Sequence, residues 1–312
     1  MTIIYLPQRE PSPVYKELGT VILCPPGRKP EFIHGADAVL VTGLEPVTRK
    51  LIEHSPALRM VASLTTGTDH IDVEALKERG IPLITLLDCP GYAAISGTAE
   101  HTWGLILALA RGYRRAFDNK ERVWGNELQG KTLGIVGYGR IGKILATYAD
   151  AFGMFAEFYD PYKEGDRFGT KFPTLADLFA QADIIAITCN LTPETEGMIG
   201  IHELKRCEPG AYLVNTARPQ IVAPGALQMA LASGFIAGAA YDFNTPETDH
   251  CRELGYNIVT TPHIGGATYE GNDKADALIA AKLKEILHEY QTNKGEKETG
   301  TTGLGHTPNP AA

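Results

Sequence analysis

The stretch LGIVGYGRIGK, residues 133–143, carries a glycine pattern that strongly constrains the local structure. Three of its glycines stand in G-x-G-x-x-G register, after a β-branched run and before a helical pattern: Gly137, Gly139 and Gly142. The first allows a tight turn, the second lets a pyrophosphate approach the backbone, and the third lets the helix pack on the strand. Phosphates would lie at the positive helix N-terminus, beside Arg140 and Ile141. The stretch therefore predicts a dinucleotide-binding site.

An acidic residue follows at the distance that such a site requires. Asp160 ends the predicted strand FAEFYD and lies eighteen residues beyond Gly142 (160 − 142). A carboxylate there can accept hydrogen bonds from the adenine ribose hydroxyls and would repel a 2′-phosphate, so NAD is favoured over NADP. Lys163 lies close by and weakens this preference. A glycine-rich turn followed by a surface aspartate is the simpler alternative, but the spacing, the flanking strand and the acid together favour the nucleotide.

The composition is typical of a soluble globular protein with a small-molecule partner. The 312 residues are 44% hydrophobic, enough for two domains with proper cores. The net charge of −8 is spread along the chain, which argues against nucleic acid or an anionic membrane as partner. Five cysteines without a C-x-x-C pair suit a reducing cytoplasm and argue against a metal site. No stretch has the pattern of a signal peptide or a membrane span.

Short β-rich runs alternate with helix-like segments, which predicts an α/β fold with two doubly wound parallel sheets. One series covers residues 38–87 and a second covers 133–260. We expect a substrate domain of residues 1–97 with 266–291, an NAD-binding domain of residues 98–265, and a disordered tail of residues 292–312. Residues 98–117 are expected to form one buried helix between the domains, and the amphipathic stretch 269–290 a helix that returns to the first domain.

Polar side chains follow three predicted strands at the edge of the sheet that faces a ligand. They are Arg218, Asp242 with Glu247 close behind, and His263. An arginine fork can grip a substrate carboxylate, and a histidine can give a proton to the oxygen of a carbonyl that is being reduced. A glutamate on the other ring nitrogen would fix the tautomer and favour the imidazolium. Each residue alone has an ordinary alternative, in a salt bridge, on a solvated loop or in a turn.

Five motifs in order make the chain resemble the D-isomer specific 2-hydroxyacid dehydrogenase family over roughly residues 55–275. They are GKTLGIVGYGRIGK, LTPETEGMIG, PGAYLVNTAR, YDFNTPE and TPHIGGAT. The resemblance implies a Rossmann cofactor domain inserted into a flavodoxin-like substrate domain, and a homodimer with the helix of residues 98–117 at its interface. It also implies that Arg218 binds substrate, that Glu247 supports the acid/base His263, that Asp242 contacts the nicotinamide carboxamide, and that backbone amides around Gly67 hold the substrate carboxylate.

The chain departs from the family pattern in places that concern the substrate. Pro219 follows Arg218 where the family has glycine, and proline biases the preceding residue toward extended geometry. Thr188 and Asn190 replace a histidine and a proline. Some segments resemble erythronate-4-phosphate dehydrogenases and others hydroxypyruvate reductases, so the acid stays open. The alternative function is that of an NAD-sensing binding protein, similar to the corepressors built on this scaffold.

Overall fold

The chain folds into two compact units. The computed structural model describes residues 1–6, 9–24, 33–120 and 122–299, and only the backbone of 289–299. The first unit consists of Met1–Tyr92 together with the chain from Asp273 onward, and the second of Ala93–Asn272. The domain boundaries expected from the sequence, at residues 98 and 265, both fall inside the second unit.

The first unit contains a five-stranded parallel sheet in the order β2-β1-β3-β4-β5. Its strands are β1 (Thr2–Tyr5), β2 (Thr20–Leu23), β3 (Ala38–Val41), β4 (Met60–Ser63) and β5 (Leu83–Ile84), with helices α1 (Arg49–Glu53) and α2 (Val73–Glu78) between them. Every residue of β3 and β4 is buried, as expected for central strands of a parallel sheet. This strand order is that of flavodoxin-like folds and confirms the expected class.

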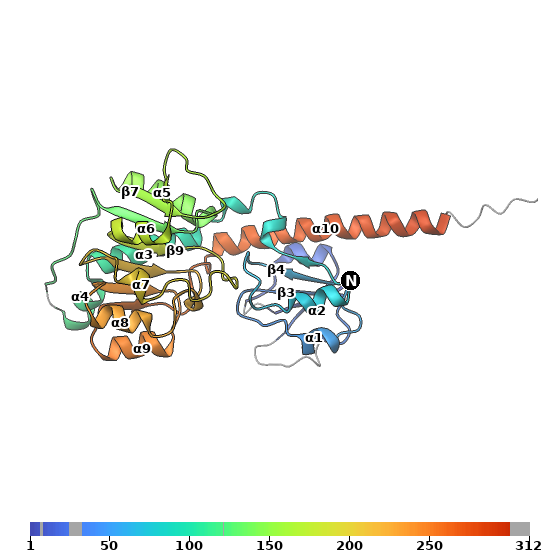
Figure 1. Cartoon of the computed structure of the whole chain (residues 1–312). Coiled ribbons are helices and arrows are strands. Elements are labelled where there is room, and N and C mark those ends of the chain that lie inside the picture. Colours follow the sequence, from blue (N-terminus) through green and yellow to red (C-terminus); the bar gives the residue numbers. More distant parts are fainter. Residues whose placement is uncertain (7–8, 25–32, 121, 300–312) are drawn as a thin grey trace, which may run out of the picture. The chain divides into compact units, whose positions relative to one another are not determined.

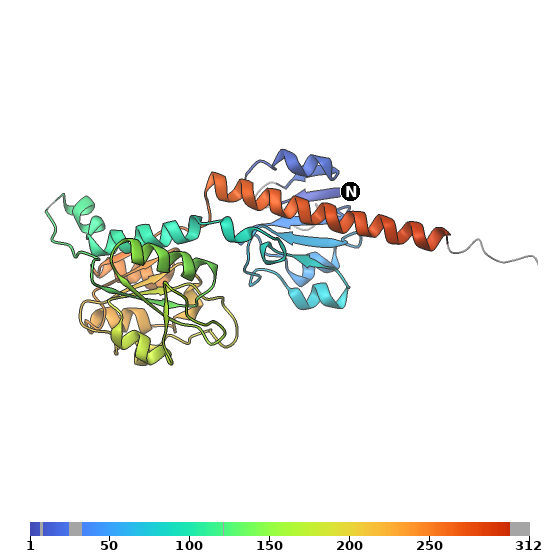
Figure 2. The ribbon, with the colours of Figure 1, turned by 90° about the horizontal axis from the view of Figure 1, so that it is seen from above.

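Helix α10 (Tyr269–Thr299) packs against the first unit through residues beyond position 272 (Figure 2). The carboxylate of Asp276 is fully buried there, paired with Arg9 at 2.6 Å and accepting a 2.9 Å hydrogen bond from the Tyr15 hydroxyl. Because α10 continues to Thr299, residues 292–299 are helical, and the expectation of a disordered tail is wrong for them. Residues 300–312 lie outside the described part. No helix within the described ranges is long and apolar enough to cross a membrane.

The second unit contains a seven-stranded parallel sheet in the order β12-β11-β10-β9-β6-β7-β8. The strands are β6 (Thr132–Val136), β7 (Phe155–Tyr159), β8 (Thr170–Lys171), β9 (Ile184–Ile187), β10 (Tyr212–Asn215), β11 (Gly238–Tyr241) and β12 (Ile258–Thr260). Counted from β6 as the first strand, the order is 3-2-1-4-5-6 with one strand added, which is the Rossmann arrangement. The chain order reverses at β6, where a nucleotide is expected to bind.

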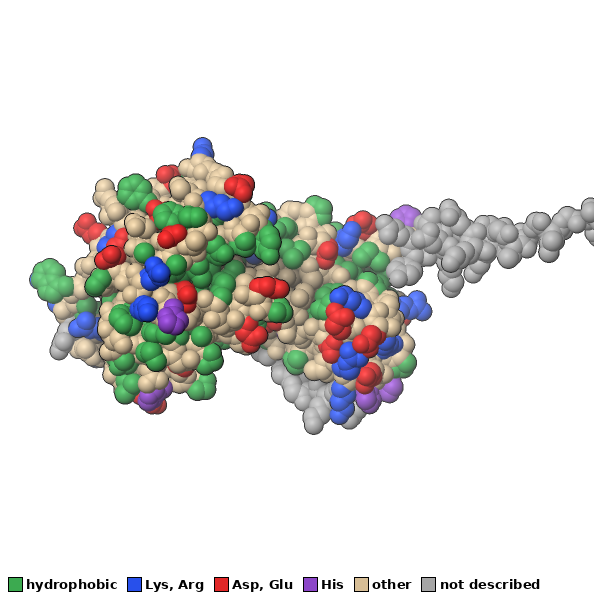
Figure 3. Space-filling model, in the orientation of Figure 1, with side chains coloured by type: hydrophobic (Ala, Val, Ile, Leu, Met, Phe, Trp, Pro, Cys, Tyr) green, Lys and Arg blue, Asp and Glu red, His purple; other side chains and the backbone are tan. Residues whose placement is uncertain are grey.

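Helices cover both faces of this second sheet (Figure 1). One face carries α3 (Gly97–Ala110) and α5 (Arg140–Ala151); the other carries α6 (Leu175–Gln181), α7 (Ile201–Leu204), α8 (Ala226–Ala232) and α9 (Pro246–Glu253). Successive strand residues point to opposite faces, so Ile185 and Ile187 enter one core while Ile184 and Ala186 enter the other. Over the surface seen in Figure 3, acidic and basic side chains are interspersed on each unit.

The helix expected over residues 98–117 is in fact two helices. The first, α3, ends at Ala110, and α4 (Tyr113–Asn119) begins after a break at Gly112. Gly112 has a φ of 62°, in the left-handed region that interrupts an α-helix, and a Cβ there would lie 2.8 Å from the Val123 side chain. The two glycines of this stretch therefore have different roles, since Gly104 lies within α3 and Gly112 ends it.

Candidate functional site

One line of paired residues crosses the second sheet where its strands end. In spatial order these residues are Tyr159, Val136, Ile187, Asn215, Tyr241 and Thr260. The strands are parallel, so the segments that follow this line all leave the sheet at the same edge. Asp160 and Gly137 come directly after it, Arg218 and His263 come three residues after it (218 − 215, 263 − 260), and Glu247 comes six residues after Tyr241 (247 − 241). The edge thus gathers the predicted cofactor and chemical residues of this unit.

The glycine turn between β6 and α5 has the close contacts that the fingerprint predicts. Gly137 has a φ of 97°, and a Cβ there would lie 2.7 Å from the backbone nitrogen of Cys189. A Cβ on Gly142 would collide with the Gly137 carbonyl, so this glycine lets the helix approach the strand. Gly139 is the N-cap of α5, with no atom within 4 Å of its Cβ position. This open backbone at the N-terminus of a twelve-residue helix fits a pyrophosphate.

Neighbouring side chains hold this turn in place. The Thr188 hydroxyl donates a 2.7 Å hydrogen bond to the Gly137 carbonyl. Arg140, the first residue of α5, donates from its guanidinium to the Ile95 carbonyl. Burial raises the pKa of the Cys189 thiol beside the turn to about 12, so this cysteine stays protonated and is not a nucleophile at neutral pH.

The carboxylate of Asp160 lies at the end of β7, as the sequence predicts. One oxygen accepts a 2.8 Å hydrogen bond from the Tyr138 N–H in the glycine turn, and the other accepts a 2.9 Å bond from the Tyr162 N–H. A carboxylate oxygen can accept more than one hydrogen bond, and Asp160 is only half-buried. Asp160 can therefore still accept hydrogen bonds from ribose hydroxyls, and the two N–H groups orient its carboxylate.

Arg218 follows β10 in the extended geometry expected before Pro219. Its φ and ψ are −146° and 140°, and its backbone carbonyl accepts a 2.9 Å hydrogen bond from the Asn215 side chain. The guanidinium donates a 2.7 Å bond to the Ala217 carbonyl. The backbone of Arg218 is thus held by the buried Asn215 side chain.

Glu247 lies in the first turn of α9. One carboxylate oxygen accepts a 3.0 Å hydrogen bond from the Gln228 N–H in α8. The neighbouring Tyr241 side chain is fully buried, and its burial, with the charge of Glu247 second, raises the pKa of the phenol. The expected bond from Glu247 to the His263 ring stays a prediction.

His263 occupies a strained turn after β12. It has a φ of 57°, a left-handed conformation that costs a non-glycine residue roughly 1–2 kcal/mol, and its N–H donates to the Thr261 carbonyl at 3.0 Å. Its half-buried ring lies 4.9 Å from the Phe243 ring, centroid to centroid. The loop thus holds the backbone of His263 in a conformation that a free peptide would rarely adopt.

Asp242 fixes the loop that carries His263. Its carboxylate is 1% exposed, and it accepts hydrogen bonds from the Thr261 hydroxyl at 2.6 Å, the Ile264 N–H at 2.8 Å and the Gly265 N–H at 2.7 Å. Burial raises the pKa of this carboxyl, but the nearby His101 ring first, and then the hydrogen bonds from Thr261, Ile264 and Gly265, outweigh burial and hold the pKa below its usual range. Asp242 is therefore an ionised anchor for the loop. The expected contact with the nicotinamide carboxamide stays a prediction.

His101 belongs to this network and was missed by the sequence analysis. From α3, its Nε2 lies 2.9 Å from the Thr261 hydroxyl and 3.4 Å from an Asp242 oxygen. The sequence signal that could have found it is the polar run Glu100-His101-Thr102, which precedes the apolar stretch WGLILALA in the same helix.

Gly67 lies in the first unit, on the loop that follows β4. Its carbonyl accepts a 3.0 Å hydrogen bond from the Thr65 hydroxyl, which also bonds to the Ser63 hydroxyl at 2.8 Å. The loop is ordered by its own hydroxyl groups. The role expected for its amides, binding of the substrate carboxylate, stays a prediction.

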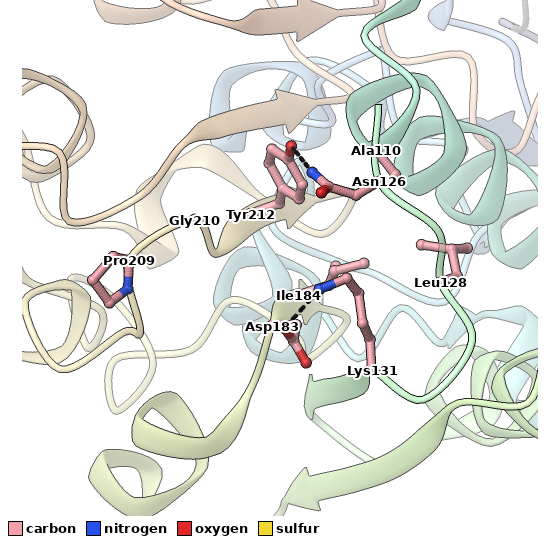
Figure 4. Close-up of a pocket in the computed structure, with 9 residues that line it drawn as sticks. All are labelled: Ala110, Asn126, Leu128, Lys131, Asp183, Ile184, Pro209, Gly210 and Tyr212. Atoms are coloured by element: carbon pink, nitrogen blue, oxygen red, sulfur yellow. Dashed lines mark hydrogen bonds and ion pairs between the residues drawn. The ribbon is translucent and has the colours of Figure 1, made fainter. Parts of the chain in front are cut away.

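A small pocket opens at the opposite edge of the second sheet (Figure 4). Lys131, Asp183 and Tyr212 border it, each at the amino end of a strand or just before it. Lys131 and Asp183 are paired at 3.0 Å, and Asn126 donates to the Tyr212 hydroxyl at 3.1 Å. Ligands of doubly wound sheets bind at the carboxyl ends of the strands, so this pocket is separate from the candidate site.

Comparison with known proteins identifies the family of the second unit. Residues 103–265 match the family model described as D-isomer specific 2-hydroxyacid dehydrogenase, NAD binding domain. The chain is 35% identical to a glyoxylate reductase of Thermococcus litoralis over 272 residues, which cover 81% of each chain. It is 36% identical to a D-3-phosphoglycerate dehydrogenase of Mycobacterium bovis over 264 residues, which cover 81% of this chain and 49% of that one. The chain thus spans about half of the second relative.

Among solved structures, the fold is similar to an NAD-dependent formate dehydrogenase of Staphylococcus aureus in complex with NAD. The TM-score is 0.79 with 27% identity, covering 93% of this chain and 96% of that one. The region matched by the family model, residues 103–265, begins within α3. It includes the glycine turn, Asp160 and the three strand ends that precede Arg218, Glu247 and His263.

Proposed function

Because the chain belongs to the D-isomer specific 2-hydroxyacid dehydrogenase family, we propose that it interconverts a small 2-hydroxy acid and its 2-oxo acid with NAD(H). The observation that carries this proposal is the line of paired strand residues in the second unit. From that line the glycine turn, an arginine, a glutamate and a histidine leave at one edge. A cofactor and a substrate bound there would be reached by all of them.

The cofactor would be held by the glycine turn and by Asp160. Gly137, Gly139 and Gly142 bring backbone N–H groups and the N-terminus of α5 to the pyrophosphate, with Arg140 and Ile141 as the first helical residues. Asp160 would accept the ribose hydroxyls. When bound, the nicotinamide supplies or accepts the hydride. The open space around Gly139 and the two bonds that orient Asp160 support this placement.

Arg218 and His263 would act on the substrate. The Arg218 guanidinium binds the carboxylate and the adjacent oxygen of the acid, which orients the carbon that exchanges hydride. The His263 imidazolium donates a proton to that oxygen in reduction, and the neutral ring accepts it in oxidation. Binding of the substrate carboxylate by backbone amides around Gly67 stays a prediction from the sequence.

Glu247 would support the protonated state of His263. A carboxylate bonded to the second ring nitrogen favours the imidazolium, and each unit of pKa rise corresponds to about 1.4 kcal/mol of interaction. The position of Glu247 in the first turn of α9, six residues after Tyr241, supports this role. Its bond to the Gln228 N–H leaves the other carboxylate oxygen for the ring.

The substrate is a small acid whose identity a panel can decide. We would follow oxidation of NADH and NADPH by absorbance with glyoxylate, hydroxypyruvate, pyruvate, longer 2-oxo acids and phosphorylated acids. Glyoxylate and phosphorylated acids are included because similar proteins are a glyoxylate reductase and a D-3-phosphoglycerate dehydrogenase. Turnover of any member supports the proposal. Tight NADH binding without turnover of any member would contradict it and favour a cofactor-sensing binding protein.

We propose that the chain forms a homodimer through its second unit. Large apolar side chains are exposed on and beside α4: Phe117 is 74% and Trp124 83% exposed. The Tyr113 and Phe117 rings lie 5.8 Å apart, and the Arg122 guanidinium lies 4.6 Å from the Trp124 ring. We call these four residues the α4 patch. Exposed aromatic residues with an arginine are typical of interface anchors.

A reducing compartment suits the cysteines, and we propose the cytoplasm as the location. In the described part of the chain no disulfide joins any of the five cysteines, which are Cys24, Cys89, Cys189, Cys207 and Cys251. Four of them are buried. Titration of thiols in the denatured protein should find five; fewer would indicate disulfides and contradict a reducing location.

A further inference from the structure

Two adjacent residues of α3 each contact one of the two loops that carry the proposed chemistry. His101 bonds to the loop of His263, and Thr102 bonds to the segment that leads to Arg218. We propose that this His101-Thr102 pair positions the acid/base and the substrate clamp relative to each other. The inference rests on the proposed function, and it assigns a role to α3 that goes beyond it.

The contact of His101 is made through Thr261 and Asp242. The His101 Nε2 lies 2.9 Å from the Thr261 hydroxyl, which donates a 2.6 Å bond to Asp242. A histidine that donates from Nε2 to this hydroxyl therefore extends a chain of hydrogen bonds that ends on the buried carboxylate. The same carboxylate accepts the N–H groups of Ile264 and Gly265, directly after His263.

There is no room for a side chain at Gly265. A Cβ there would lie 2.7 Å from an Asp242 oxygen and 3.4 Å from the His101 ring. The glycine thus lets the loop backbone approach the Asp242 carboxylate, to which its N–H donates at 2.7 Å. A left-handed residue such as His263 persists where its surroundings determine its conformation, and this network supplies that constraint.

The contact of Thr102 is made through Thr216. The Thr102 hydroxyl donates its proton to the Thr98 carbonyl at 2.6 Å, so the Thr216 hydroxyl must be the donor in the 2.7 Å bond between Thr216 and Thr102. Thr102 is fully buried and Thr216 is 7% exposed. Thr216 stands between Asn215 and Ala217, whose mutual hydrogen bond shapes the turn before Arg218.

Because the two contacts come from neighbouring residues of one rigid helix, the two loops share a single reference. A displacement of about 1 Å in a reacting group can lower a rate about 100-fold. Two loops that are hydrogen-bonded to the same helix keep a constant distance from each other, so these contacts should affect the reaction rate as well as the stability of the fold. Neither His101 nor Thr102 needs to touch substrate or cofactor. They are positioning residues.

The test compares variants that remove one contact at a time. His101→Leu removes the donor to Thr261, while His101→Gln keeps an amide N–H at a similar reach. Thr102→Val keeps the shape and removes the hydroxyl, while Thr102→Ser keeps the hydroxyl. Thr147→Val in α5 is the matched control, because the Thr147 hydroxyl bonds only within its own helix, to the Ile144 carbonyl at 2.7 Å.

Amide hydrogen exchange gives a readout that needs no turnover. We expect His101→Leu to speed exchange in peptides that contain Ile264 and Gly265, and Thr102→Val to speed it in peptides that contain Ala217. Each variant should leave the other loop unchanged, and Thr147→Val should change neither. Equal acceleration of both loops by either variant, or of neither, would overturn the proposal.

Steady-state kinetics with the active acid then test the catalytic consequence. His101→Leu should lower kcat about tenfold or more with KM within about twofold, and Thr102→Val should mainly raise KM. His101→Gln and Thr102→Ser should recover most of the loss. Parallel changes of kcat and KM in both variants would show a merely structural role. An inactive wild-type protein would instead contradict the proposed function, while the exchange data would still decide the positioning.

Discussion

The carboxylate of Asp160 is bonded at 2.8 Å to the backbone N–H of Tyr138, so the acidic end of β7 is tied to the turn that would hold the pyrophosphate. One residue thus contributes both the charge that selects the ribose and a contact that shapes the phosphate site. Replacement of Asp160 should therefore affect both.

Asp160→Ser should lower kcat/KM for NADH about tenfold or more, because the hydrogen bonds to the ribose hydroxyls and the contact with Tyr138 are lost. The value for NADPH should fall less or rise, since the charge that repels a 2′-phosphate is gone and Lys163 lies nearby. Initial rates with both coenzymes measure the ratio. Asp150→Asn, an exposed change on α5, is the control. An unchanged NADH to NADPH ratio would remove Asp160 from coenzyme selection.

His263→Gln should lower kcat by about 10² to 10⁴ and leave the Kd of NADH nearly unchanged, because the loss falls on proton transfer and not on cofactor binding. Fluorescence titration gives the Kd and absorbance gives kcat. His250→Gln changes an exposed histidine of α9 and should have no effect. If the His263 variant turned over at the rate of the wild type, another group would have to move the proton.

Much of the fold could be predicted from the sequence, because buried parallel strands and their helices leave a periodic pattern. The fingerprint located the β6–α5 turn, and the alternation of runs indicated two doubly wound sheets. The break at Gly112 was not predicted, since its left-handed φ and the space that Val123 leaves for a glycine there are visible only in the folded chain. The helical extent of α10 beyond residue 291 was also missed, because the polar composition of that segment favours disorder.

Those residues of the candidate site that directly follow a strand could be predicted from the sequence. Arg218 and His263 follow strands directly, so their common edge could be foreseen from a parallel sheet. His101 could not, because it lies within a helix 160 residues before its partner Thr261. Only the folded structure shows that Asp242 accepts the loop amides of Ile264 and Gly265, which makes it an anchor in addition to a candidate cofactor contact.

Tyr138→Phe should lower the free energy of unfolding by about 1 kcal/mol, the typical value of one hydrogen bond. The Tyr138 side chain is fully buried, stacks on Phe158 at 3.8 Å between centroids, and donates from its hydroxyl to Asp166 at 2.7 Å. Phenylalanine keeps the stacking and loses only the bond. Denaturant unfolding measures the change, with exposed Tyr162→Phe as control. Equal stability of Tyr138→Phe and the wild type would show that this bond has no net value.

Asp166→Asn should remove one contribution to the loss of folding stability at low pH. The hydrogen bond from Tyr138, then the N–H groups of Phe168 and Gly169, lower the pKa of Asp166. A carboxyl with a lowered folded pKa stabilises the fold above its unfolded pKa of about 3.9, and this contribution is lost as the pH falls through the folded pKa. The stability difference between wild type and variant should therefore shrink as the pH falls below the unfolded pKa of about 3.9. It should be below about 1 kcal/mol, since the side chain is 36% exposed.

Urea unfolding at several pH values measures this difference. A gap that stayed constant, or that widened as the pH fell, would mean that the Asp166 carboxylate is not stabilised by its neighbours. Asp177→Asn is the comparison variant. The Asp177 carboxylate also accepts a hydrogen bond, from the exposed Thr174 hydroxyl at the N-cap of α6 in the same unit.

Trp124→Ser should convert the proposed homodimer to a monomer. Trp124 is the most exposed aromatic residue of the α4 patch, at 83%. Truncation of a large aromatic anchor commonly costs an interface about 2 kcal/mol or more, about a thirtyfold change in Kd. Size-exclusion chromatography with light scattering gives the mass across a dilution series, and Tyr162→Ser, an equally exposed aromatic outside the patch, is the control. A wild-type protein with the mass of one chain would contradict the dimer. A variant that stayed dimeric on dilution would place its interface away from α4.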